Sequence, residues 1–163
     1  MRVVVLADTH VRDIGSTRLP DRAWAELASA DVILHAGDVM EAGLLEQLRQ
    51  VAPTHAVLGN NDGALTGVLP EALTLELEGV AVAMIHDSGP RTGREGRLHR
   101  RFPAAAVVVF GHSHIPWNQV GLEGQLLFNP GSATQRRAQP HRTLGVLDLD
   151  KGRVKKHEIV VVE

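Results

Sequence analysis

The chain has 163 residues, of which 44% are hydrophobic and 22% charged, a composition typical of a globular domain rather than a disordered or fibrous chain. Its formal net charge of −2 does not indicate a general nucleic-acid or membrane surface, and the absence of cysteine excludes disulfides, thiolate metal sites and cysteine nucleophiles. The apolar run before Asp8 is too short for a signal sequence or a membrane span, so we expect a cytoplasmic location. The chain length is that of one domain, which we expect over residues 1–163.

The first half of the chain alternates short apolar runs with helical patterns. We expect helices from about Pro20 to Ser29 and from about Glu41 to Val51, because proline suits a first helical turn and leucines recur at helical spacing in the second segment. The expected strands are 2–7, 31–35 and 55–59. This order predicts a βαβαβ unit whose strands are parallel.

After residue 70 the pattern is mainly one of strands. Segments 72–79 and 80–86 predict a hairpin around Gly79, because leucines alternate with polar residues in the first of them. The segment 91–101 holds five arginines, and four of them recur at helical spacing. The remaining expected strands are 105–110, 118–122, 125–129, 142–149 and 154–162.

Potential metal ligands follow the carboxyl ends of these strands. Each of them alone is typical of a turn, a helix cap or an ordinary buried histidine. In open α/β sheets, however, ligands bind in the crevice beyond the carboxyl ends of the strands, so seven donors at five strand ends indicate one shared site. The set is Asp8, His10, Asp38, Asn60, His86, His112 and His114.

These residues form five short motifs in a fixed order, and no single one of them is specific. The motifs are "DTH" (8–10), "GDV" (37–39), "GNND" (59–62), "IHD" (85–87) and "GHSH" (111–114). Together they resemble the motifs of the calcineurin-like metallophosphoesterases, and the compact length is most similar to the small YfcE-like phosphodiesterases of that superfamily. The resemblance implies an α/β fold in which two mixed β-sheets pack as a sandwich flanked by helices.

Carboxylate, amide and imidazole donors suit manganese, iron, nickel or zinc rather than calcium. The resemblance implies two divalent metal ions per chain, with manganese the first expectation. It places Asp8, His10 and His114 on one ion and Asn60, His86 and His112 on the other. Asp38 would bridge the two. The implied activity is that of a metal-dependent phosphoric ester hydrolase, a phosphodiesterase more than a monoesterase, acting by in-line attack of a metal-bound hydroxide.

The catalytic residues implied by the resemblance are Asp38, Asn60, Asn61 and Asp62. Asn61 stands where the most active relatives have a histidine that assists the leaving group, and an amide cannot donate a full proton. The sequence therefore predicts slow turnover, activated substrates or another proton donor. Asp62 and Asp87 are expected either to orient neighbouring ligands or to form turns.

The arginine segment 91–101 has two interpretations, a solvated helix face or a rim that attracts phosphate. Arg136 and Arg137 would extend such a rim, and they follow the turn-like sequence "NPGS" (129–132), in which Gly131 and Ser132 are candidate phosphate donors. His35 is expected to pack or to hydrogen-bond rather than to bind metal.

Two other functions stay open at this stage. One is a non-catalytic interaction scaffold like the phosphoesterase-fold subunit of retromer, and the other is a nuclease. We expect a small phosphate ester as the substrate, do not favour nucleic acid at this net charge, and expect no membrane partner. The oligomeric state, with homodimer and homotetramer among the options, is open. Substrate choice should depend on segments 11–19, 88–101 and 132–140.

Overall fold

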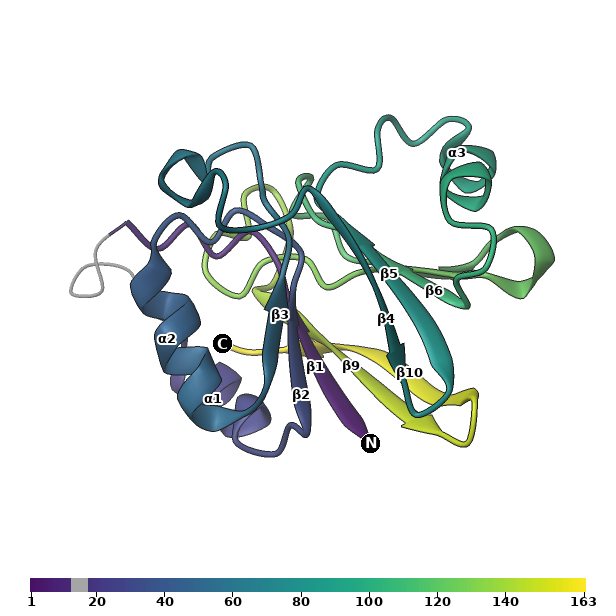
Figure 1. Cartoon of the computed structure of the whole chain (residues 1–163). Coiled ribbons are helices and arrows are strands. Elements are labelled where there is room, and N and C mark those ends of the chain that lie inside the picture. The colour runs from purple at the N-terminus through teal and green to yellow at the C-terminus, as the bar shows by residue number, and fades with distance from the viewer. Residues whose placement is uncertain (13–17) are drawn as a thin grey trace.

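The computed structural model describes residues 1–12 and 18–163. In this part of the chain ten strands form two sheets of five strands each, and three α-helices cover them (Figure 1). None of these helices has the length and apolar character that crossing a membrane requires. The two mixed sheets and their helices confirm the predicted α/β class.

The first sheet has the order β10-β9-β1-β2-β3. Its parallel part contains β1 (Arg2–Leu6), β2 (Val32–His35) and β3 (Thr54–Ala56), connected through α1 (Asp21–Leu27) and α2 (Ala42–Val51). The predicted βαβαβ unit is confirmed, although β3 is shorter than expected. Beyond Ala56 the Val57 amide still donates to the His35 carbonyl of β2, and the Leu58 amide donates to the Pro70 carbonyl. The antiparallel part is completed by β9 (Thr143–Asp150) and β10 (Arg153–Val161).

The second sheet has the order β4-β5-β6-β8-β7. The predicted hairpin is present as β4 (Ala72–Leu77) and β5 (Val80–Ile85). The sheet continues with β6 (Val107–Val109), β8 (Leu126–Asn129) and β7 (Trp117–Val120), of which β6 and β8 are parallel to β5. Short 3-10 turns lie at Gly63–Leu65 and Leu122–Gly124, and α3 spans Arg94–Arg101.

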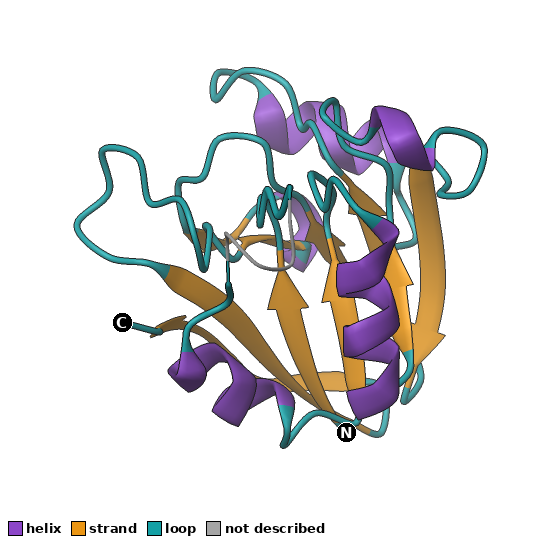
Figure 2. Ribbon diagram, turned by 90° about the vertical axis from the view of Figure 1, so that its left-hand side faces the viewer, coloured by secondary structure: helices purple, strands orange, loops and turns teal. Residues whose placement is uncertain are grey.

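Alternation along the strands sorts side chains into three apolar clusters. In β1, Val3 and Val5 face the second sheet, whereas Val4 and Leu6 pack among residues of α1 and α2. The space between the sheets is filled by fully buried side chains such as Phe128. A third cluster lies where Leu98 of α3 packs on the outer face of the second sheet. The layers are thus helix, sheet, sheet and helix, and loops gather above the carboxyl ends of the central strands (Figure 2).

Candidate metal centre

The predicted ligands lie in the loops that leave the carboxyl ends of β1, β2, β3, β5 and β6. Five of the seven have a left-handed backbone, with φ between 47° and 69°. Such angles are unusual outside glycine and cluster at functional sites, where they turn a side chain sharply. The five are Asp8, His10, Asp38, His112 and His114.

Glycines in the motifs allow these loops to approach one another. A Cβ atom on Gly37, whose φ is +90°, would lie 2.6 Å from Nδ1 of His86. A Cβ atom on Gly111 would lie 2.9 Å from a carboxylate oxygen of Asp8. Close packing around the predicted ligands therefore requires glycine at positions 37 and 111, the first residues of "GDV" and "GHSH".

One group of donors comprises Asp8, His10 and His114. Nε2 of His114 lies 3.1 Å from Nε2 of His10 and 3.7 Å from Oδ1 of Asp8. Nδ1 of His114 lies 2.6 Å from the Gln135 carbonyl, to which it donates, so the lone pair of Nε2 faces the other two side chains. The second carboxylate oxygen of Asp8 is buried with no hydrogen-bond partner in the described part of the chain. Converging lone pairs and an orphaned carboxylate oxygen fit a divalent cation.

A second group gathers around His86. Its Nδ1 donates to the Ala36 carbonyl at 2.7 Å, which leaves Nε2 facing Oδ1 of Asn60 at 2.9 Å. Nδ1 of His112 approaches the same amide oxygen at 3.0 Å. Two imidazole nitrogens thus approach the same amide oxygen, and His86 also groups with the carboxylates of Asp8 and Asp38, whose donor atoms lie within 4.8 Å of one another.

Asp38 joins the two groups. Its Oδ1 lies 3.5 Å from Nε2 of His86, and its Oδ2 lies 3.4 Å from Nε2 of His10. Each oxygen therefore faces a different histidine, one from each group.

The buried charges are strongly coupled. Burial raises the pKa of Asp8 to about 7, although the attraction of His86 opposes it. Burial also opposes ionisation of Asp38, but hydrogen bonds from His86 and Asn61 hold the pKa of that carboxyl below its usual range. Burial lowers the pKa of His10 and of His114, which favours the neutral imidazoles that metals bind. The positive charge of Arg137 opposes the rise in the pKa of Asp8 and adds to the lowering at His10 and His114, so this arginine acts on the same end of the centre.

Asn61 is exposed and Asp62 is buried, and both contact Asp38 or its backbone. The backbone amide of Asn61 donates to Oδ1 of Asp38 at 2.8 Å, and its side-chain amide donates to Oδ2 at 2.7 Å. The buried carboxylate of Asp62 accepts the backbone N–H groups of Asp38, Met40 and Gly59 at 2.6–2.9 Å. Asp62 therefore holds the loop after β2 against the loop after β3, and both residues position Asp38.

The segment "NPGS" braces the centre from the other side. The Ser132 hydroxyl donates to the Asp8 carbonyl at 2.7 Å, and the Thr134 hydroxyl donates to the Thr9 carbonyl at 2.7 Å. The Ser132 hydroxyl is therefore already engaged, which does not support its role as a phosphate donor. These contacts join residues more than 120 positions apart, and no local signal in the sequence indicated them.

His35 is fully buried and lies 3.0 Å from the Thr9 hydroxyl, so the expectation of a packing role is confirmed. Three other histidines contact polar side chains away from the centre. His99 lies near the carboxylate of Glu123, and His141 lies near that of Glu163. His157 hydrogen-bonds to Asn118.

The arginines of segment 91–101 do not form one solvated face. Arg91 and Arg94 each lie 5.0 Å from the centre of the Trp117 ring, and Arg91 precedes the helix. Arg97 donates to the carbonyls of Ser88, Pro90 and Thr92 and so holds the loop before α3. The segment 11–19, the other expected rim, lies partly outside the described residues.

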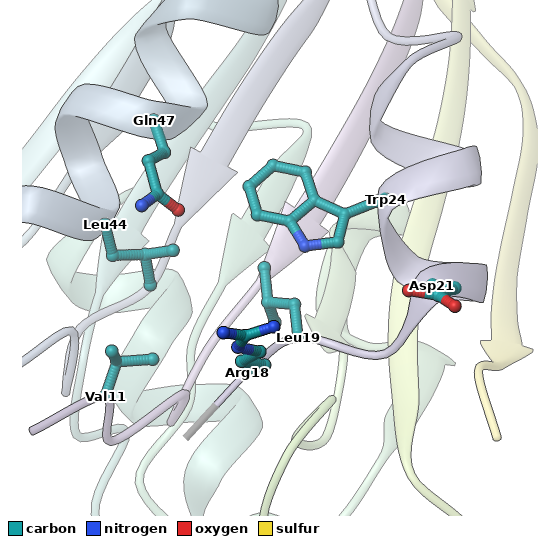
Figure 3. Close-up of a pocket in the computed structure, with 7 residues that line it drawn as sticks. All are labelled: Val11, Arg18, Leu19, Asp21, Trp24, Leu44 and Gln47. Carbon is teal, nitrogen blue, oxygen red and sulfur yellow. The ribbon is translucent and has the colours of Figure 1, made fainter. Parts of the chain in front are cut away.

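A separate cavity of about 290 Å³ lies between α1 and α2, and none of the predicted ligands lines it (Figure 3). The helices contribute Asp21, Trp24, Leu44 and Gln47, and the loop after β1 contributes Val11, Arg18 and Leu19.

Residues 1–152 match the family model of the calcineurin-like phosphoesterase superfamily domain. The chain belongs to this superfamily. A probable metallophosphoesterase from Methanothermobacter thermautotrophicus is 32% identical over 84% of the chain and 80% of its own length.

Two solved structures show the same fold. A single mutant of Vps29 from Entamoeba histolytica is similar with a TM-score of 0.78 at 22% identity over 100% of both chains. A novel archaeal phosphodiesterase is similar with a TM-score of 0.75 at 18% identity over 99% of both chains. At these identities the likeness establishes the fold of this phosphoesterase and not its activity.

Proposed function

We propose that this member of the superfamily is a binuclear metal-dependent phosphodiesterase. The observation that carries the proposal is Asp38, whose two oxygens face His86 and His10 at 3.5 and 3.4 Å and thus connect the two donor groups. Divalent cations, when bound, would supply Lewis acidity to a phosphoryl oxygen and activate a water molecule. Manganese is the metal we expect first, with nickel, iron and zinc as the alternatives.

The protein's own residues would act by position. His114 and His86 each present Nε2 to the centre because a backbone carbonyl holds Nδ1. Asn61 and Asp62 fix Asp38, so the bridging carboxylate needs no rearrangement when metal binds. No imidazole stands at position 61, so a leaving group of high pKa lacks a proton donor there, which favours good leaving groups.

We infer a small phosphodiester rather than a monoester as substrate, and a cytoplasmic location. The archaeal phosphodiesterase neighbour supports the diester at the level of the fold alone. A net charge of −2 gives no support to a nuclease acting on long nucleic acid.

A scaffold function is the second candidate, because the fold is also that of Vps29. The complete set of converging donors favours catalysis over it, since a binding surface does not require a strained metal centre.

The test begins with protein stripped by chelator and reloaded separately with manganese, nickel, zinc or magnesium. Metal content per chain is measured, followed by hydrolysis of bis(4-nitrophenyl) phosphate, 4-nitrophenyl phosphate and single-stranded DNA. We expect two ions per chain and preferential hydrolysis of the diester, both lost in Asp38→Asn. A folded, metal-free chain without hydrolysis would support the scaffold, and two bound metals in Asp38→Asn with full activity would refute the assigned bridge.

A further inference from the structure

A pocket of about 290 Å³ opens beside the metal centre, at the end formed by Asn60 and His86. Its floor includes the apolar side chains of Leu58 and Ile85, and Arg101 at the end of α3 also lines it. A group attached to a phosphate held at the centre would enter this pocket, because two predicted ligands form part of its wall. The volume is near the lower end of the range for small-molecule sites.

Arg101 differs from Arg91, Arg94 and Arg97 of the same segment. Arg91 and Arg94 lie over Trp117, and Arg97 is engaged with backbone carbonyls. Arg101 is exposed, forms no ion pair within the described part of the chain, and has its guanidinium carbon 5.5 Å from the centre of the Phe102 ring. Its donors are therefore available to a ligand in the pocket.

Two carboxylates also line the pocket. Oδ1 of Asp87 accepts the backbone N–H of Gly89 at 2.7 Å, so this group is partly engaged in a turn. Glu71 is exposed and lies directly before β4. A ligand in the pocket therefore meets positive charge from Arg101 and negative charge from Glu71 and Asp87. The two variants Arg101→Gln and Glu71→Gln should act in opposite directions on an anionic group.

We propose that this pocket binds the nucleoside part of a phosphodiester and that Arg101 binds a second phosphate carried by that nucleoside. The inference rests on the proposed function for the position of the scissile phosphate. Leu58 and Ile85 offer an apolar surface to the sugar or base, and the planar guanidinium of Arg101 suits bidentate binding of phosphate oxygens. Arg101 is thus a residue that determines specificity for the nucleoside part of the substrate.

The experiment compares two chromogenic diesters, thymidine 5′-(4-nitrophenyl phosphate) with and without a 3′-phosphate. The measured quantity is the ratio of their kcat/KM values in wild type, Arg101→Gln, Glu71→Gln and the control Arg100→Gln. Arg100 is exposed on the same helix and does not line the pocket. We expect wild type to prefer the 3′-phosphate, Arg101→Gln to lower the ratio about tenfold, as befits one charge-assisted hydrogen bond, and Glu71→Gln to raise it.

A second measurement needs no turnover. Calorimetry compares binding of thymidine 3′,5′-bisphosphate and thymidine 5′-phosphate to the manganese-loaded proteins, with folding and metal content checked in each variant. Equal ratios and equal affinities in Arg101→Gln and Arg100→Gln would overturn the inference. If wild type binds metal but hydrolyses neither diester, the proposed function fails, and the calorimetric comparison still decides whether Arg101 binds the second phosphate.

Discussion

Asp62 offers a direct test of whether a residue beside the centre positions the ligands or takes part in chemistry. Its buried carboxylate accepts three backbone N–H groups from the loops after β2 and β3. The change Asp62→Asn keeps the shape but replaces an ionised acceptor by an amide that carries two hydrogens. We expect the two loops to separate and the position of Asp38 to become less well defined.

The magnitude follows from those three bonds. Oδ2 of Asp62 accepts two of these bonds, so an asparagine that places its amide oxygen there keeps both and loses the one from the Met40 amide. Hydrogen bonds to a charged group contribute about 1.5–3 kcal/mol each, so this loss should destabilise the chain by about 1.5–3 kcal/mol. For a domain of this length that corresponds to a fall in Tm of roughly 3–12 °C, since each kcal/mol shifts Tm by about 2–4 °C. Metal affinity should fall as well, because the loop that carries Asp38 must be ordered again when metal binds.

The assay combines urea unfolding of the metal-free chain, calorimetric titration with manganese, and diester hydrolysis at increasing manganese. Asp62→Asn should show lower stability and weaker metal binding, but much of kcat should return at saturating metal. Unchanged stability and affinity together with a kcat that saturating manganese does not restore would show that Asp62 acts on the substrate, and the positioning argument would be refuted.

Three other changes have defined outcomes. Burial lowers the pKa of His35 from 6.5 to about 3, so the neutral histidine contributes to the free energy of unfolding above pH 6.5. This contribution is lost as the pH falls toward 3, by about 5 kcal/mol in all. Urea titrations at a series of pH values should show a shallower loss of stability in His35→Leu than in wild type. Arg137→Gln should weaken inhibition by inorganic phosphate several-fold, whereas Arg136→Gln, whose arginine donates to the Gln139 carbonyl, should not; equal inhibition constants would remove Arg137 from the phosphate site. Asn61→His should accelerate alkyl diesters relative to nitrophenyl diesters by up to about 100-fold, measured as a smaller dependence of kcat/KM on leaving-group pKa; no change in slope at full metal content would contradict the assigned lack of a proton donor.

The sequence placed the predicted ligands at strand ends because each apolar run ends shortly before a donor. The parallel βαβαβ unit placed the ends of β1, β2 and β3 at one edge, and the structure confirms this arrangement. The second sheet was predicted only through the family resemblance. In this sheet β6 pairs directly with β8, although β7 comes between them in the sequence, and sequence order does not reveal such a pairing.

The supporting contacts could not be predicted from local pattern. Ser132 donates to the Asp8 carbonyl across 124 positions, and such pairing depends on how the two sheets pack rather than on any periodicity. The arginine spacing correctly indicated a helix, but it did not show that Arg97 would turn back onto the loop before α3 while Arg101 faces a pocket. Long flexible side chains take partners that the fold supplies, so their roles appear only in three dimensions.

The left-handed backbone at five predicted ligands has an evolutionary consequence. Each such residue costs about 1–2 kcal/mol relative to a relaxed conformation, and glycine or asparagine at the same position would avoid most of that cost. A lineage no longer selected for metal binding would gain stability with every ligand that it lost in this way. The fold therefore has a downhill thermodynamic route by which such a set of donors can be lost.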